Sequence, residues 1–198
     1  MKKFLVLVCT LVLLIGCTVL VANAASNKTG YCEKCQDTVT WEPIVWGEVK
    51  AGTHKHYYVT ADTTAASQFT LKAGANACID LNGKQLTFKS GRAFLLMSAT
   101  EAAPASLSIQ DSVGGATVTS WSYLSGADSG FSSNTNNGAG GVMWVDDYCT
   151  LDIYGGTYRM EVKGSTSRTS TGGILAIYHT TSTATTGGTV NMYDGVVL

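Results

Sequence analysis

The sequence has little charge, little proline and no helical periodicity. Asp, Glu, Lys and Arg make up only 14% of its 198 residues, whereas about a quarter is usual in soluble globular proteins. The formal net charge of −1 leaves no basic face, which argues against a nucleic-acid partner. After residue 25, no apolar stripe recurs at the roughly 3.6-residue spacing of a helix. With two prolines, 22 glycines and abundant Ser, Thr and Asn, the composition is typical of strands and turns.

Sequence motifs of common enzyme classes are also missing. The chain contains no nucleophile elbow, phosphate-binding glycine loop or H-E-x-x-H zinc motif. At 198 residues, it is long enough for a targeting segment and one domain with a buried core. The sequence therefore predicts an architecture and a compartment more directly than a reaction.

The first 24 residues have the three parts of a secretory signal peptide. Two lysines precede an apolar run over residues 4–21, and Ala22-Asn23-Ala24 offers a cleavage site. We expect cleavage after Ala24 and a secreted or cell-surface protein that has no membrane contact afterwards. Two alternatives stay open. The apolar run is a membrane anchor, or a lipid is attached at Cys17, because Leu14-Ile15-Gly16-Cys17 resembles a bacterial lipoprotein box.

Removal of the signal segment leaves four cysteines: Cys32, Cys35, Cys78 and Cys149. Cys32-Glu33-Lys34-Cys35 is a C-x-x-C knuckle, whose two thiolates can hold one metal ion or pair as a disulfide. A zinc site would need two more ligands, and His54 and His56 are the nearest candidates. A disulfide is the alternative in an exported chain. The other two cysteines begin strand-like runs, and we expect them to be small core residues.

Residues 25–56 form an N-terminal head that contains the knuckle. Trp41 and Trp46 also lie in this head, and an indole ring offers a flat apolar face and one hydrogen-bond donor. Both tryptophans are candidates for stacking on a carbohydrate. Alternatively, they plug the open end of a stack of strands, which would otherwise expose an unpaired edge. The sequence thus predicts a capping head before residue 57.

From residue 57 onward, the chain is a series of short strand-like runs with one recurring phrase. The phrase reads apolar, polar, apolar, any residue, and then Asn, Asp or Gly. It occurs at Ile79–Gly83, Leu107–Asp111, Leu151–Gly156 and Val190–Gly195, so its starts lie 28, 44 and 39 residues apart (107 − 79, 151 − 107, 190 − 151). A more fully apolar run precedes three of the phrases.

Three strands per turn, with corners at Gly, Asn or Asp, predict a right-handed parallel β-helix over residues 57–198. One such unit cannot bury its inward row of side chains alone, so neighbouring units must stack. The polar segment 120–139 then loops out at a corner. The alternative is an antiparallel sandwich with tight hairpin loops. Because Val196-Val197-Leu198 lies in a strand with no polar cap after it, we expect further rungs beyond it.

These features resemble the secreted right-handed parallel β-helix (pectin-lyase-like) repeat proteins of gut and rumen anaerobic bacteria. In that family, a cysteine-containing head leads through a tyrosine-rich strand to a Leu-Asn-Gly rung and then to glycine-rich repeats. The matching segments are Cys32 and Cys35, Tyr57-Tyr58-Val59, Asp80–Lys84, Leu107–Ser112, Gly140–Val142 and Tyr154–Thr157. The resemblance covers most of residues 31–198. It implies the fold, and because most of those proteins have no assigned activity, it implies no reaction.

One segment is also similar to a catalytic phrase of pectate lyases, which cut acidic polysaccharides beside a bound calcium ion. Residues 142–147 read VMWVDD, where the lyase phrase has Trp-Ile-Asp-His. Asp147 takes the place of the histidine, and Asp146 and Asp147 are the catalytic candidates. However, adjacent residues of a strand point to opposite faces, which does not suit a paired-carboxylate site. The alternative is a solvent-exposed turn at the end of a rung.

We therefore expect a non-catalytic secreted or surface protein that binds a polysaccharide, or a host or cell-surface protein, through the faces of its stack. The polar surface composition and the tyrosines at 123, 154, 178 and 193 motivate this expectation. Tyr154 joins Trp41 and Trp46 as a ligand-binding candidate. The alternative function is a polysaccharide lyase or hydrolase of the pectin-lyase type. No cofactor is fixed by the sequence: zinc at the head is a candidate beside the disulfide alternative, and calcium is implied only by the lyase alternative.

Overall fold

The computed structural model describes residues 25–49, 52, 54–65, 68–89, 92–97, 100–123, 141–163, 173–177 and 186–198. Every regular element in these residues is a β-strand, which confirms the all-β class. No helix that is long and apolar enough to span a membrane occurs among them. The expected signal peptide and most of the expected insertion at 120–139 lie outside the described residues.

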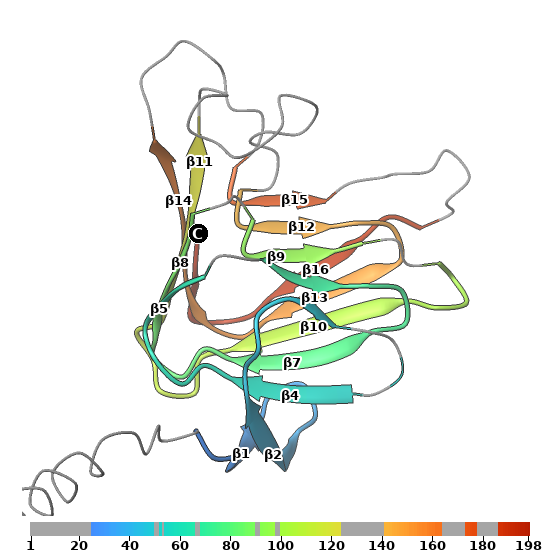
Figure 1. The fold of residues 1–198 in the computed structure, drawn as a ribbon. Coiled ribbons are helices and arrows are strands. Elements are labelled where there is room, and N and C mark those ends of the chain that lie inside the picture. The colour runs from blue at the N-terminus through green and yellow to red at the C-terminus, as the bar shows by residue number, and fades with distance from the viewer. Residues whose placement is uncertain are drawn as a thin grey trace, which may run out of the picture.

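The described strands form three sheets (Figure 1). The first sheet has seven strands, in the spatial order β1 (Lys28–Cys32), β2 (Asp37–Pro43), β4 (His54–Tyr58), β7 (Asn76–Asp80), β10 (Ala105–Gln110), β13 (Cys149–Ile153) and β16 (Thr189–Met192). The second has five: β5 (Thr63–Ala65), β8 (Gln85–Phe88), β11 (Thr117–Tyr123), β14 (Gly156–Lys163) and β17 (Val196–Val197). The third also has five: β3 (Glu48–Val49), β6 (Phe69–Leu71), β9 (Phe94–Leu96), β12 (Met143–Val145) and β15 (Leu175–Ile177).

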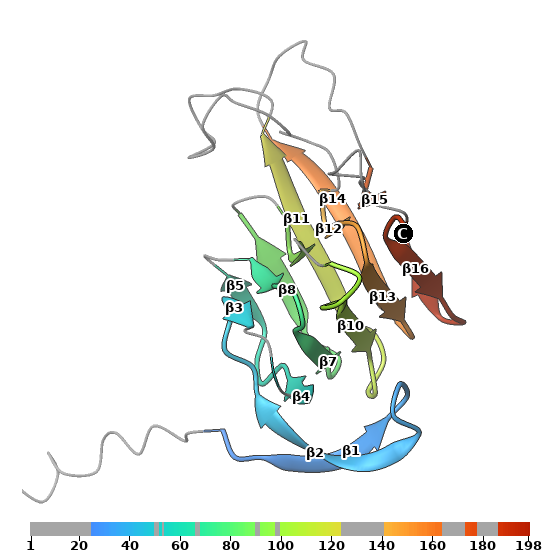
Figure 2. The same ribbon diagram turned by 90° about the vertical axis from the view of Figure 1, so that its right-hand side faces the viewer.

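From β4 onward, consecutive strands belong to the first, second and third sheet in turn. For example, β10, β11 and β12 pair in parallel with β7, β8 and β9, the strands three places earlier in the chain. Figure 2 shows β4, β7, β10, β13 and β16 of the first sheet following one another across the molecule. The parallel pairing contradicts the antiparallel sandwich, because among the described strands only β1 and β2 pair antiparallel.

Alternate residues of the first sheet fill the interior between the three sheets. Successive side chains of a strand point to opposite faces, and one face of β7, β10 and β13 is aliphatic apart from the Cys149 thiol at the start of β13. Its residues are fully buried in the main core: Ala77, Ile79, Leu107, Ile109, Leu151 and Ile153. The inward face is therefore a continuous apolar row across neighbouring strands.

The pairing register differs in one place from the alignment of the recurring phrase. The alignment set Ile79 beside Leu107, whereas the structure pairs Ile79 with Ile109, and Ala77 with Leu107. From Leu107 to Leu151 the alignment is right. A shift by two residues keeps the same side chains on the inward face, so the apolar pattern fits both registers.

Glycine and asparagine form corners of the chain where φ is positive. Asn82 (φ 54°) and Gly83 (φ 71°) turn the chain after β7, and Gly156 (φ 97°) turns it into β14. A Cβ atom at Gly156 would also lie 2.9 Å from Cδ1 of Leu81. Gly156 is therefore required both for its backbone conformation and for the close approach of the neighbouring corner.

The head contains more regular structure than the sequence predicts. β1 and β2 form an antiparallel hairpin in which Cys32 lies opposite Asp37. The end of β2 joins the first sheet in parallel, with Pro43 beside Tyr58 of β4. The hairpin therefore continues the first sheet, and it lies at one end of the molecule in Figure 2.

Candidate metal centre

The β1–β2 hairpin covers outward-facing side chains of the first sheet. On β7, Ala77 and Ile79 belong to the main core, so Cys78 and Asp80 between and beyond them point away from it. Cys78 and Asp80 are nevertheless only 2% and 1% exposed. Cys78 packs with Cys32 of the hairpin in a small separate cluster. The hairpin thus converts an outer face of the sheet into a second interior.

Two lysines of the hairpin pair with buried carboxylates on this face. Lys28 Nζ donates to Asp80 Oδ2 at 2.8 Å on β7, and Lys34 Nζ donates to Asp152 Oδ2 at 2.8 Å on β13. Both carboxylates are 1% exposed. A carboxylate that is buried so completely needs a charged or hydrogen-bonding partner. The lysines supply that partner and fix where the hairpin lies.

The side chain of Gln110 on β10 makes a third connection, to the backbone of the hairpin. The side-chain oxygen of Gln110 accepts the N–H of Glu33 at 2.9 Å, and its amide nitrogen donates to the carbonyl of Tyr31 at 2.9 Å. The hairpin is therefore held to β7, β10 and β13, and these contacts fix its turn against the outer face of the sheet.

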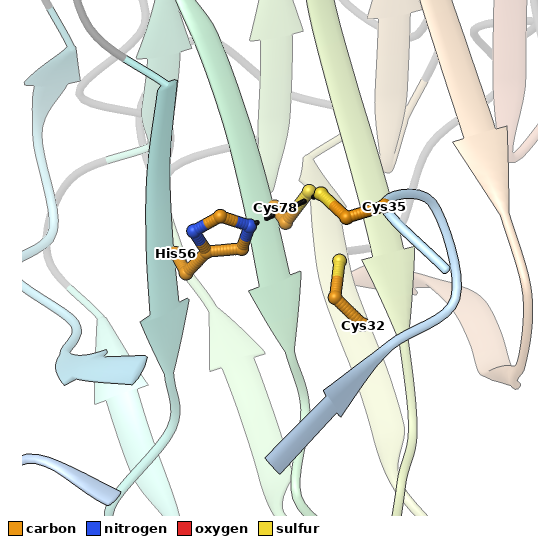
Figure 3. Close-up of side chains that lie close together, drawn as sticks. All are labelled: Cys32, Cys35, His56 and Cys78. Atoms are coloured by element: carbon orange, nitrogen blue, oxygen red, sulfur yellow. Dashed lines mark hydrogen bonds between the residues drawn. The ribbon is translucent and has the colours of Figure 1, made fainter. Parts of the chain in front are cut away.

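Four metal-ligating side chains converge beneath this turn (Figure 3). Cys32 ends β1, Cys35 lies in the turn, His56 lies on β4 and Cys78 on β7. The three Sγ atoms and one imidazole nitrogen all lie within 4.8 Å of one another. His56 Nε2 is 3.3 Å from Cys35 Sγ, the contact drawn as a dashed line in Figure 3.

Local backbone structure brings these donors together in pairs. Gln36 has a positive φ of 54°, and its N–H donates to the carbonyl of Cys32 at 2.8 Å, so the short turn brings Cys35 back beside Cys32. His56 and Cys78 are direct partners in the parallel register of β4 and β7. Directly paired residues present their side chains on the same face of a sheet. Each pair is therefore built by one element, and the hairpin contacts join the two pairs.

The three thiols differ in how readily they ionise. The pKa of Cys32 is lowered to about 5, chiefly because the Cys78 side chain donates a hydrogen bond to its thiolate. The same hydrogen bond, together with burial, raises the pKa of Cys78. Burial foremost raises the pKa of Cys35. These shifts favour one thiolate in the group and oppose ionisation of the other two thiols, and a bound cation would offset that opposition.

His54 lies beside the group of four. Its Nε2 is 3.1 Å from Cys78 Sγ and 4.0 Å from Cys35 Sγ, and its ring centroid is 4.5 Å from that of His56. Burial foremost, and then the charge of His56, lowers the pKa of His54, which favours the neutral imidazole that a metal requires.

The structure thus brings together three of the four ligands expected from the sequence, namely Cys32, Cys35 and His56. Cys78 takes the fourth place in the group; it is buried, as expected of a small core residue, but in the small separate cluster and not in the main core. Cys149 does lie in the main core. The four cysteines among the described residues are free thiols, so this part of the structure contains no Cys32–Cys35 disulfide. Three thiols and one imidazole are the donor set of structural zinc sites.

Trp41 supports the centre. It is fully buried, its indole N–H donates to the carbonyl of Gly30 at 3.1 Å, and its ring packs edge-on against His56 with centroids 5.3 Å apart. Trp46 packs edge-on against Phe88 at the end of the main core, with centroids 5.2 Å apart. Trp41 therefore presents no open ring face to a carbohydrate, and the alternative role of the two tryptophans as a plug stays a prediction.

Tyr154 lies in a different part of the surface. Its ring stacks on that of Tyr193, with centroids 4.3 Å apart and an interplanar angle of 5°. It lines a shallow hollow of about 240 Å³ together with Asp111 and corner glycines such as Gly155. Burial foremost raises the pKa of Tyr154. A ligand-binding role for Tyr154 stays a prediction.

The two catalytic candidates lie in a buried turn. Asp146 and Asp147 are each 3% exposed, so the expectation of a solvent-exposed turn is wrong. Asp146 Oδ1 accepts the N–H of Asp147 at 3.0 Å, and the Asp146 carbonyl accepts the N–H of Cys149 at 3.2 Å. The Asp146 carboxylate thus stabilises the turn after β12, and catalysis by either residue stays a prediction.

Comparison with known proteins found no relative of the chain. No family model, no curated protein and no solved structure matches the chain. The likeness to secreted β-helix proteins therefore stays a prediction, and the case for a function depends on the geometry of the thiol- and imidazole-rich centre.

Proposed function

We propose that this protein is an exported, non-catalytic binding scaffold with the fold of a right-handed parallel β-helix. We propose further that one zinc ion fixes its N-terminal hairpin to the stack. Cys32, Cys35, His56 and Cys78 would hold this ion. The observation that carries the zinc role is the convergence of these four donor atoms within 4.8 Å, from three separate segments of the chain.

The donor set fits zinc in particular. Zinc accepts thiolate sulfur and imidazole nitrogen in a four-coordinate, tetrahedral site, and structural sites have protein ligands at all four positions. The ion, when bound, would supply a crosslink between the hairpin, β4 and β7. It would also neutralise the thiolates, so that Cys35 and Cys78 could ionise despite their raised pKa values.

The order of the strands supports the β-helix. From β4 to β17, each strand follows the preceding one into the next sheet, and the strands within each sheet pair in parallel. A chain that coils through three faces produces this order. Right-handedness is part of the proposal, because parallel strand connections are right-handed in nearly all proteins.

Two features support binding over catalysis. The carboxylates of Asp146 and Asp147 are buried, where a polysaccharide chain has no access to them. By contrast, Tyr31 and Tyr193 are each 47% exposed, and exposed aromatic rings are typical of surfaces that bind glycans or proteins. Export is proposed from the features of residues 1–24, and the partner would be a polysaccharide or a cell-surface protein.

Metal analysis of the purified protein tests the zinc role. We expect one zinc ion per chain when the protein is purified with reduced thiols and without chelators. Cys32→Ser and Cys78→Ser should each lose most of the zinc, since each removes a ligand. Cys149→Ala is the matched control, because this buried cysteine lies in the main core. It should keep the wild-type zinc content.

Thermal unfolding gives a second measurement. A chelator should lower the Tm of the wild type and of Cys149→Ala, and it should leave the Tm of Cys78→Ser unchanged. A reduced wild-type protein that neither contains zinc nor takes it up on titration would overturn the zinc role.

A further inference from the structure

The candidate centre has one more imidazole than a four-coordinate zinc site needs. His54 Nε2 lies 3.1 Å from Cys78 Sγ and 4.0 Å from Cys35 Sγ. His56 Nε2 lies 3.3 Å from Cys35 Sγ. Both imidazoles therefore contact thiols of the same group, and each is at a distance that two ligands of one ion have from one another.

The sheet places both histidines on one face. His54 and His56 are two residues apart on β4, so their side chains point the same way. Their ring centroids are 4.5 Å apart. Both ring nitrogens that contact the thiols are Nε2 atoms, so the two side chains approach the centre in the same manner.

Their surroundings differ. His56 is half-buried and packs against Trp41, with centroids 5.3 Å apart and an interplanar angle of 82°. His54, at the start of β4, is the more exposed of the two histidines. Packing thus fixes the His56 ring more firmly than the His54 ring, and His54 lies on the side of the centre that solvent reaches.

We propose that His54 is a second, interchangeable imidazole ligand of this centre. A thiophilic cation held by Cys32, Cys35 and Cys78 would take its nitrogen from His56 in the resting protein and from His54 when His56 is displaced. The exchange breaks one metal–nitrogen bond and forms another, with no change in charge or oxidation state. This inference rests on the proposed zinc centre and adds a ligand to it.

Titration with Co²⁺ under reducing conditions tests the exchange, because tetrahedral Co²⁺ with thiolate ligands absorbs visible light and its spectrum reports the ligand set. We compare the wild type with His54→Ala, His56→Ala and the double variant. Lys55→Ala is the control, since Lys55 lies between the histidines, points to the other face and pairs with Glu42 at 3.3 Å.

His54→Ala and Lys55→Ala should bind Co²⁺ within about threefold of the wild type. His56→Ala should bind about 10- to 100-fold more weakly but keep the bands of a three-sulfur, one-nitrogen site. The double variant should lose about a further 100-fold and those bands. His56→Gln, which keeps bulk beside Trp41, repeats the comparison if His56→Ala folds poorly.

Two other outcomes separate the inference from the proposed function. If the wild type binds Co²⁺ but His56→Ala and His56→Gln bind it no better than the double variant, His54 is no ligand and the inference fails alone. If the reduced wild type does not bind Co²⁺, the centre itself is wrong and both proposals fail.

Discussion

Strands β7, β10 and β13 of the first sheet bury side chains on both faces, but the two faces are stabilised in different ways. On the inward face, β7, β10 and β13 present aliphatic side chains and the Cys149 thiol to the main core. On the outward face, the same strands present polar side chains that are just as inaccessible: Cys78, Asp80, Ser108, Gln110 and Asp152. Neighbours in the sequence thus belong to two interiors with different chemistry.

The difference follows from what covers each face. The other two sheets cover the inward face, and shape and apolar area suffice to hold it together. A single hairpin covers the outward face, and it contributes two lysines, backbone groups and two thiols to specific partners. Among the described residues, no buried side-chain nitrogen or oxygen lacks a hydrogen-bond partner. The second interior, beneath the hairpin, is therefore held together by directional contacts. A single substitution, or removal of a metal, can break such contacts.

Substitution of two adjacent residues of β10 compares the faces directly. Ile109→Ala should lower the free energy of unfolding by about 2–5 kcal/mol, because it leaves a cavity in the fully buried inward row. Ser108→Ala should cost at most about 1 kcal/mol, because the hydrogen bond from its hydroxyl to Asp152 is long, at 3.5 Å. Urea unfolding measures both. Equal losses in the two variants would contradict the distinction between the faces.

The inward face could be predicted from the sequence because its signal is local. Alternation of apolar and polar residues places Leu151 and Ile153 in a strand and on one face without knowledge of any partner. The corner at Asn82 and Gly83 is equally local, since positive φ favours those residues. The register of β7 against β10 could not be predicted in this way, because a shift of two residues preserves the pattern.

The outward face could be predicted only in part. The C-x-x-C spacing of Cys32 and Cys35 is local, and so is the spacing of His54 and His56. For Cys78 the sequence predicts only burial in a core, although its own strand contains a signal that separates it from the main core. If Ile79 points inward, Cys78 must point outward, where a buried thiol needs a covering segment. The fold of the hairpin over β7 depends on contacts between distant residues, which no local pattern contains.

The next expected effect is a pH dependence of stability, which the Cys32 thiol beneath the hairpin introduces and the main core does not. The folded pKa of Cys32 is about 5, against an ordinary value of 9.0. Its ionisation therefore stabilises the fold fully above the ordinary pKa, and this contribution is lost as the pH falls towards about 5. The free energy of unfolding of the metal-free, reduced protein should rise between about pH 6 and pH 8.5, by at most about 1.4 kcal/mol per pH unit.

Variants of two buried cysteines check the origin of this slope. Cys32→Ser should flatten it, and Cys149→Ala, a change in the main core, should retain it. The raised pKa values of Cys35 and Cys78 act in the opposite direction, but only above their ordinary value of 9.0. Urea unfolding across this pH range measures the effect, and an unchanged slope in Cys32→Ser would assign it to other groups.

The smallest expected loss of stability distinguishes two ion pairs of the hairpin region. In one pair the carboxylate is buried, and in the other both side chains are exposed. Lys34→Met removes the partner of the buried Asp152, while Asn191 Nδ2 still donates to that carboxylate at 2.8 Å. Because the Lys34 side chain is 42% exposed, we expect a loss of about 1–2 kcal/mol, between the ranges for exposed and fully buried pairs. The amide of Glu33, which donates to Gln110, should exchange its hydrogen faster as the hairpin loosens.

Lys55→Met is the matched control, since Lys55 pairs with Glu42 at 3.3 Å and both side chains are about as exposed as that of Lys34, at 40% and 45%. It should change the free energy of unfolding by less than about 0.5 kcal/mol. Urea unfolding and hydrogen exchange of the metal-free protein measure both variants. If Lys34→Met has no more effect than Lys55→Met on either measurement, the lysine contacts contribute no stability to the second interior beneath the hairpin. The thiol centre would then be the main tether of the hairpin.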